Sequence, residues 1–212
     1  MDYLVKIYRS VYFHAVKKSA RTRQFIISTT APLFNKQGFW GTSLSDLQVA
    51  TGLTKGSLYG NFSDKEEIAR EAFYYAMQQT RAFVRDRMNR KETARGKLIA
   101  LLSFYSDYVF NPPIPGGCPL LNSAVEADDF NLTMKEAVAE EIAKTIGSIA
   151  ELLELGKRSG EFRRDFKVKE LATVFFTSVE GAIMVSRVSG TDTAMKIVVR
   201  HCKGLLDQIT IK

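Results

Sequence analysis

Hydroxyl, amine and phenol groups are concentrated in one short stretch of the sequence, residues 54–61. Thr54, Lys55 and Ser57 come first, and Tyr59 follows. Side chains of these types donate hydrogen bonds to phosphate oxygens and to the edges of bases. The stretch is therefore a candidate for contact with a nucleic acid, provided that one rigid element presents these side chains together.

The residues before this stretch fit the first half of a helix-turn-helix. Ser43 and Asp46 have the spacing of an N-terminal capping box, and Ser63 and Glu66 have the same spacing before the next helix. Gly52 stands where a tight turn needs a positive φ angle. We expect two short helices, over residues 43–51 and 54–61, with leucines between them as a small core. Any compact pair of short helices would give a similar pattern, so the spacing alone leaves DNA binding and simple helix packing equally open.

A longer run, from Phe34 to Ile68, contains several short motifs. They are Phe34, Gly38 and Phe39, then Thr42-Ser43-Leu44, then Thr54-Lys55-Gly56-Ser57-Leu58-Tyr59, and then Phe62-Ser63-Asp64-Lys65-Glu66. With these motifs the run resembles the N-terminal DNA-binding domain of the TetR family of transcriptional regulators. The resemblance implies an all-α protein, in which an N-terminal three-helix helix-turn-helix domain precedes a C-terminal helical domain for ligand binding and dimerisation. It also implies a repressor, the family default, which a small and largely apolar effector releases from a palindromic operator.

The same resemblance assigns the DNA contacts. Residues at the start of the second short helix would face bases or phosphates, Tyr59 would donate its hydroxyl to a phosphate, and Lys65 would meet the DNA backbone at the start of the next helix. Lys65 could instead be a solvated charge, and the basic residues within 17–23 could form either an arm on the DNA or a solvated helix end. The DNA-binding candidates are Thr42, Thr54, Lys55, Ser57, Tyr59, Asn61 and Lys65.

A second cluster of candidates lies on the helix expected over residues 92–110. Leu101, Phe104, Tyr105 and Tyr108 fall on one face of that helix, and such a stripe is usually simple core. In a TetR-like protein this helix and the two that follow usually enclose the effector, so an apolar pocket is the alternative hypothesis. The ligand-binding candidates are Phe83, Phe104, Tyr105, Tyr108, Cys118, Asn122, Phe176 and Glu180.

Cys118 raises a separate question of reactivity. Gly117-Cys118-Pro119 begins a segment that resembles a TetR subgroup including the LmrA- and YxaF-like repressors. A thiol at a helix N-terminus can have a lowered pKa and react with oxidants or electrophiles. The alternative, a small buried residue that lets the loop pack, has more weight.

The last two helices, expected over 168–188 and 191–209, carry apolar faces that can associate. In the family, two such helices from each subunit form a four-helix bundle, and a two-fold homodimer carries two recognition helices to successive major grooves. The dimer-interface candidates are Phe175, Val179, Ile183, Ile197, His201 and Leu205.

Composition restricts the class of protein. Residues 1–65 contain nine Lys or Arg and three Asp or Glu, out of a net charge of +7 for all 212 residues. The first third is therefore where a polyanion would bind. With two histidines and no GxSxG, P-loop or HExxH pattern, we expect neither an enzyme nor a metal or other cofactor. Two distant cysteines and no long apolar run indicate a cytoplasmic protein without a membrane segment.

Apolar spacing of three and four residues runs through almost the whole chain, which predicts an all-α fold. We expect an N-terminal extension over residues 1–18, either helical or disordered, a helix-turn-helix domain over 19–65, and an effector-binding and dimerisation domain over 66–212. The expected helices cover residues 19–37, 43–51, 54–61, 63–89, 92–110, 118–127, 130–158, 168–188 and 191–209.

Overall fold

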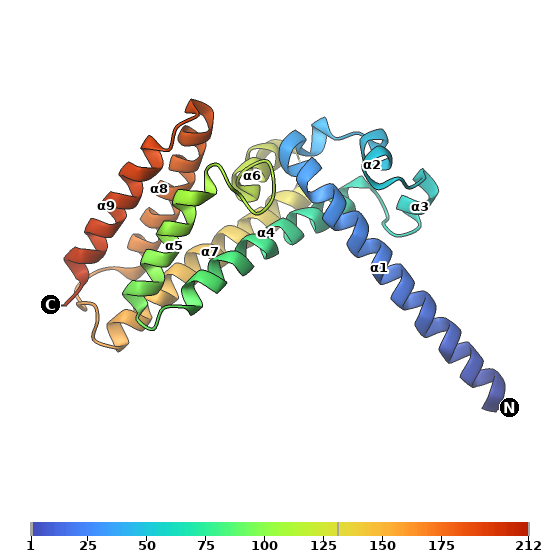
Figure 1. Cartoon of the computed structure of the whole chain (residues 1–212), viewed down its shortest axis with the longest axis horizontal. Coiled ribbons are helices and arrows are strands. Elements are labelled where there is room, and N and C mark those ends of the chain that lie inside the picture. Colours follow the sequence, from blue (N-terminus) through green and yellow to red (C-terminus); the bar gives the residue numbers. More distant parts are fainter. Residues whose placement is uncertain (1, 131, 212) are drawn as a thin grey trace. The chain divides into compact units, whose positions relative to one another are not determined.

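The computed structural model describes the backbone of residues 2–130 and 132–211, and the side chains of residues 19–128 and 132–211. Most of this part of the chain is helical and no strand is formed in it, so the all-α prediction is confirmed (Figure 1). The helices are α1 (Asp2–Gly41), α2 (Leu44–Thr51), α3 (Lys55–Tyr59), α4 (Lys65–Asn89), α5 (Ala94–Tyr108), α6 (Pro119–Phe130), α7 (Leu132–Arg158), α8 (Val168–Ser189) and α9 (Thr193–Ile209).

The chain divides into two compact units, Met1–Tyr75 and Ala76–Lys212. The division falls inside α4, whereas the sequence placed it at the beginning of that helix. One uninterrupted helix thus contributes residues to both units.

The first unit packs α1 against α2 and α2 against α3. Its core contains Ile26, Leu47, Leu58 and Ile68, all with no exposed surface. Of the two expectations for the N-terminal extension, the structure has the helical one, because α1 already begins at Asp2. The helical conformation of α1 is interrupted at Gly38, whose φ of 75° lies in the region that glycine adopts most easily.

Side-chain caps fix where the short helices begin. The Ser43 hydroxyl accepts a hydrogen bond from Asp46 N, and Ser43 N donates to Asp46 Oδ2 at 2.7 Å, so the predicted capping box is confirmed. A second box, expected between Ser63 and Glu66, is wrong in register. Asp64 Oδ1 accepts from Glu67 N at 2.7 Å, while Ser63 N donates to Glu67 Oε2. The cap before α4 therefore lies one residue later than the sequence indicated.

The second unit is a helical bundle in which α7 lies beside α5, α6 and α8, and α9 lies beside α5 and α8 (Figure 1). Leu98, Leu153, Phe175, Ile183 and Met195 form part of its core and are at most 1% exposed. An isolated antiparallel bridge pairs Phe162 with Thr210. The end of α9 is thus joined to the connection that follows α7.

Gly156, on α7, provides a test of this junction. An added Cβ there would lie 2.1 Å from the Phe162 ring, which is itself 1% exposed. We expect Gly156→Ala to lower the free energy of unfolding by about 1–3 kcal/mol through overpacking. Gly147→Ala on the same helix is the matched control, because nothing lies within 4 Å of its added Cβ. Urea unfolding should show the control unchanged or stabilised by up to about 1 kcal/mol, and equal behaviour of the two variants would contradict the packing.

Candidate nucleic-acid interface and ligand pocket

Helix α3 presents a polar surface because its single large apolar side chain turns inward. Leu58 is fully buried, whereas Thr54, Lys55 and Ser57 are exposed. Thr54 is the N-cap and accepts a hydrogen bond from Ser57 N at 3.2 Å. Three of the expected DNA-binding side chains therefore lie together at the exposed N-terminal end of one helix.

The remaining candidates near α3 lie at its C-terminal end. Tyr59 is half-buried, with the Lys55 ammonium 6.0 Å from its ring centroid. Asn61 is also half-buried, and its amide donates to Ser57 O at 2.9 Å. The Asn61 amide therefore already helps to terminate α3.

Arg23, on α1, holds the connection between α3 and α4. Its guanidinium donates to Asn61 O and, at 2.8 Å, to Glu67 Oε1, and it lies 4.1 Å above the centroid of the Phe62 ring. The hydrogen bond from Ser63 N, followed by the one from Arg23, lowers the pKa of Glu67 to about 2. Arg23 thus has an internal role that the sequence did not indicate, and a simple solvated helix end is excluded for this residue.

Lys65 also has an internal role. Its ammonium donates to Phe39 O at 2.9 Å and to Thr42 O at 2.8 Å, and lies 4.0 Å from the Phe39 ring centroid. These bonds satisfy carbonyl groups at the end of α1, a role that the sequence did not indicate. The simple solvated charge is therefore excluded for Lys65, and its contact with DNA stays a prediction.

Thr42 requires a correction. Its side chain is fully buried, and its hydroxyl donates to Gly38 O at 2.7 Å. The Thr42 hydroxyl is therefore used to close the turn after α1 and is not at the surface, where a phosphate could reach it.

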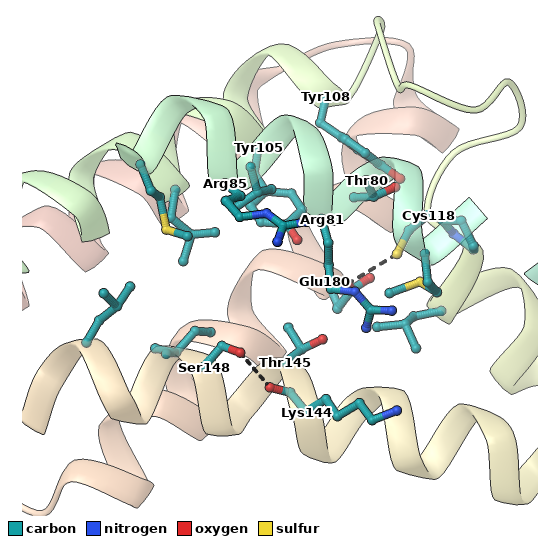
Figure 2. A pocket seen from close by; sticks show the side chains of 18 residues that line it. Thr80, Arg81, Arg85, Tyr105, Tyr108, Cys118, Lys144, Thr145, Ser148 and Glu180 are labelled. Carbon is teal, nitrogen blue, oxygen red and sulfur yellow. Dashed lines mark hydrogen bonds between the residues drawn. The ribbon is translucent and has the colours of Figure 1, made fainter. Parts of the chain in front are cut away.

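In the second unit, α4, α5, α6, α7 and α8 surround a cavity of about 330 Å³ (Figure 2). Four expected ligand-binding residues line it, namely Tyr105, Tyr108, Cys118 and Glu180. This volume lies within the range of ligand sites in proteins. The sequence singled out none of the lining residues that α4 and α7 supply, which are Met77, Thr80, Arg81, Val84, Arg85, Met88, Lys144, Thr145, Ser148, Ile149 and Leu152.

The other four ligand-binding candidates do not line this cavity. Phe83 is 53% exposed, Phe104 is buried, and the Asn122 amide donates to Gly116 O at 3.1 Å. Phe176 lines a separate cavity of about 20 Å³, which shares Tyr105 and Glu180 with the larger one. Successive residues of a helix point in different directions, which explains why Tyr105 lines the cavity and Phe104 does not.

Burial controls the electrostatics of the cavity. It raises the pKa of Glu180 to about 7, although the Cys118 thiol donates to Glu180 Oε1 at 3.2 Å (Figure 2). Burial, followed by the charge of Glu180, raises the pKa of Cys118 well above its usual range. The lowered pKa expected for Cys118 is therefore wrong, and the burial of the thiol agrees with the alternative reading of a small buried residue.

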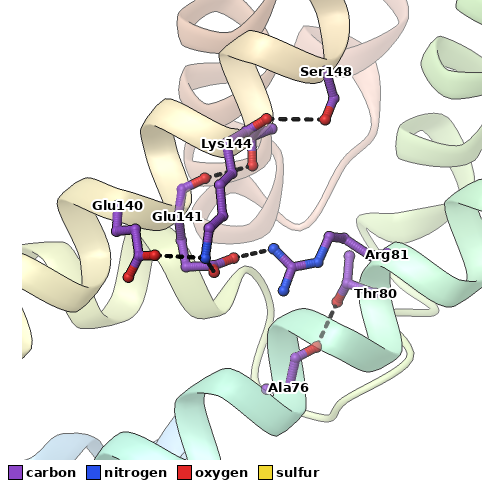
Figure 3. Close-up of polar contacts among 8 residues, drawn as sticks. Ala76, Thr80, Arg81, Glu140, Glu141, Lys144 and Ser148 are labelled. Carbon is purple, nitrogen blue, oxygen red and sulfur yellow. Dashed lines mark hydrogen bonds and ion pairs between the residues drawn. The ribbon is translucent and has the colours of Figure 1, made fainter.

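Charged side chains from α4 and α7 pair beside the cavity (Figure 3). Arg81 donates to Glu141, which is fully buried. Lys144 lies 2.8 Å from Glu140 and 3.2 Å from Glu141. Two cations thus face two carboxylates, and the charge of this group is balanced.

The face expected to form a dimer also requires a correction. Phe175, Val179 and Ile183 are at most 6% exposed, so they belong to the core of their own unit. Ile197 is 51% exposed, His201 is exposed and Leu205 is half-buried. The sequence missed the outward apolar side chains of α8, which are Val174, Met184, Val185 and Val188.

By its length and apolar composition alone, α8 could span a membrane. Its inward face is core, and its outward face carries the apolar side chains named above. Together these two faces account for its high mean hydropathy. Among the described residues, no three His, Cys, Asp or Glu side chains gather as metal ligands would.

Comparisons with known proteins agree with this arrangement. The family described as "Bacterial regulatory proteins, tetR family" matches residues 26–72, and the "Tetracyclin repressor-like, C-terminal domain" matches residues 94–202. A solved TetR-family regulator from Cytophaga hutchinsonii is 36% identical, with a TM-score of 0.86 over 92% of this chain and 98% of that one.

Two further relatives extend the comparison. The regulator LmrA of Bacillus subtilis is 28% identical over 82% of this chain and 90% of its own length. A cysteine mutant of the TetR-family regulator CifR, solved with 26-base-pair operator DNA, has a TM-score of 0.77 at 23% identity, over 85% of this chain and 94% of that one. These relatives are transcriptional regulators and not enzymes. The chain belongs to the TetR family of DNA-binding transcriptional regulators.

Proposed function

We propose that this protein is a homodimeric, cytoplasmic repressor that binds a palindromic operator and leaves it when a small, largely apolar effector occupies the cavity of the second unit. The observation that carries the proposal is the exposed N-terminal end of α3, where Thr54, Lys55 and Ser57 lie beside one another. A short helix with a polar outer face fits a major groove about 12 Å wide. The operator complex of CifR, which shares the fold, supports this mode of docking.

The groups around α3 divide into two kinds. Lys55 and Ser57 are exposed, so we assign them to base edges or phosphates, and we assign the Tyr59 hydroxyl to a phosphate. Arg23 is instead a positioning residue, because its hydrogen bonds go to Asn61 O and Glu67. Lys65 combines its internal hydrogen bonds with a place at the first residue of α4, so we retain a contact with the DNA backbone for it.

The dimer interface that we propose uses the outward faces of α8 and α9. Val185, Val188 and Ile197 are between 47% and 87% exposed, which is unusual for side chains of their size. A two-fold axis along such a surface would bring identical patches together and place two copies of α3 in successive grooves.

The link between effector and operator that we propose is α4. The helix begins with Lys65 in the first unit, and Met77, Val84 and Met88 on its later turns line the cavity. A ligand that favours one position of those turns therefore acts on a helix whose other end belongs to the DNA-binding unit. Coupling between such sites is typically about 1–3 kcal/mol, which corresponds to a roughly 5- to 150-fold change in affinity.

The test of DNA binding uses Tyr59→Phe and Lys55→Ala with duplex operator selected from genomic fragments. We expect roughly tenfold weaker binding by Tyr59→Phe, because a hydrogen bond to a charged phosphate is lost. Lys55→Ala should either reduce the salt dependence of binding or change the preferred operator sequence. Lys169→Ala, an exposed lysine in the second unit, is the control. Wild-type affinity, salt slope and sequence preference in both α3 variants would contradict this docking.

The test of the dimer uses Val188→Glu and Ile197→Glu, each of which places a charge on the proposed interface. Light scattering should show monomers, and operator affinity should fall because only single half-sites can be bound. Val125→Glu is the control, since Val125 is 76% exposed on α6, away from this face. If both interface variants remain tight dimers, the subunits associate elsewhere.

A further inference from the structure

We propose that Glu180 recognises the effector and that the effector is an organic cation, a protonated amine attached to an apolar body. This inference rests on the proposed function, because it assumes that the cavity of the second unit is the effector site. It adds the chemical class of the ligand, and it is derived from the polar groups that face this cavity.

Glu180 differs from every other polar side chain in the described part of the chain. Its Oε2 is the only buried side-chain nitrogen or oxygen there without a hydrogen-bond partner. Its Oε1 accepts one hydrogen bond, from the neutral thiol of Cys118 at 3.2 Å. No described cation pairs with it, although a buried carboxylate without a partner is costly. Such a group at a cavity wall is a candidate for binding a ligand.

Four hydroxyl groups of the cavity already have acceptors for their protons. Thr80 donates to Ala76 O at 3.1 Å, Tyr108 to Gly117 O at 3.2 Å, Thr145 to Glu141 O at 2.8 Å and Ser148 to Lys144 O at 2.9 Å. A ligand that carries only acceptors would have to break one of these bonds or accept from Tyr105 or Arg85, which also line the cavity. A ligand that carries a donor has Glu180 available to it.

The cations beside the cavity do not favour an anionic ligand. Arg81 and Lys144 are paired with Glu140 and Glu141 (Figure 3), and an anion would compete with those carboxylates. Arg85 is exposed on α4, and its charge is therefore screened by solvent. Among the buried charged groups that line the cavity, the carboxylate of Glu180 is the one that has no counter-ion in the described part of the chain.

The rest of the cavity suits the body of such a ligand. Met77, Val84, Leu101 and Leu152 provide apolar walls. Tyr105 and Tyr108 lie on the same helix with ring centroids 5.6 Å apart, and both line the cavity with Glu180. Aromatic faces attract ammonium groups, so the two tyrosines complement the carboxylate in favouring a cation.

The test compares three probes that share one phenylbutyl body: 4-phenylbutylammonium, 4-phenylbutanol and 5-phenylpentanoate. Calorimetry with the full-length protein at pH 8 should show the ammonium binding on the order of tenfold tighter than the alcohol, with the carboxylate weakest. If the alcohol binds as tightly as the ammonium, the cation preference is refuted while the effector pocket stands. If none of the three binds, the pocket and its preference are both refuted.

Glu180→Gln keeps the size of the side chain and removes its charge. We expect it to weaken binding of the ammonium probe on the order of tenfold and to change binding of the alcohol less than about threefold. Glu151→Gln, an exposed carboxylate on α7, is the control and should leave both affinities unchanged. An equal loss for both probes in Glu180→Gln would assign the residue to the shape of the pocket and would overturn the proposal.

Protonation of Glu180 gives an independent signature. Because burial raises its pKa to about 7, the carboxyl gains charge between pH 6 and pH 8, and affinity for the ammonium should rise over that interval. The pKa values of Tyr105, Tyr108 and Cys118 are raised by burial, so these groups stay neutral. The cationic groups that line the cavity are Arg81, Arg85 and Lys144, and Arg187 acts on Tyr108 from α8. A flat pH profile for the ammonium would contradict the role of the carboxylate.

The stability of Glu180→Gln separates this effect from misfolding. A carboxyl whose pKa is higher in the folded state than in the unfolded state destabilises the fold once pH exceeds the unfolded value, and most strongly above the folded value. We therefore expect Tm of the variant to exceed that of the wild type by more at pH 8 than at pH 5. A lower Tm at pH 8 would show that the charge is stabilised by the protein itself and would overturn the proposal.

Discussion

The shortness of α3 is the constraint on which the first unit depends. A helix of five residues, Lys55–Tyr59, has no stability of its own in water, because it gains too few hydrogen bonds to offset the cost of nucleation. Its position must come from its neighbours. Leu58 anchors it in the core, Thr54 caps it, and Arg23 binds the chain where it leaves the helix. With its apolar and terminal groups held in this way, α3 keeps its polar residues on the outside.

The first turn of α4 has two roles. Glu67 accepts hydrogen bonds from Ser63 N and from Arg23, and Lys65 donates to two carbonyl groups at the end of α1. The same turn therefore belongs to the frame that holds α3 and begins the helix that runs on into the second unit. In the function that we propose, this continuity allows a ligand to influence DNA binding without touching α3.

Much of this structure could be predicted from the sequence, because capping residues, glycines and apolar spacing act locally. The beginnings of α2 and α4 were located to within a residue or two by Ser43 and by the Ser63 region. The direction that a side chain faces could not be predicted as well. Helix α8 is apolar on two sides, and we predicted from the sequence that Val179 and Ile183 form the interface. In the structure these two residues are buried, whereas Val185 and Val188 are exposed. Periodicity identifies such faces but does not indicate which of them meets the core.

The cavity shows the same limit. The sequence predicted ligand binding by Tyr105, Tyr108, Cys118 and Glu180, and these four residues line one cavity. The contribution of α7 depends on which helices pack together over long sequence distances, and no local signal reports that. Nor does the sequence indicate that Cys118 donates to Glu180, or that Glu180 lacks a cationic partner among the described residues, because both follow from burial.

The most direct test of the account measures how the operator changes the affinity for a ligand in the cavity. Calorimetry would titrate 4-phenylbutylammonium into the wild-type protein, alone and with saturating operator duplex. Because linkage between two sites is reciprocal, the account predicts that the operator weakens ligand binding roughly 5- to 150-fold, by the same factor as the ligand weakens operator binding. Equal ligand affinities with and without operator would contradict it.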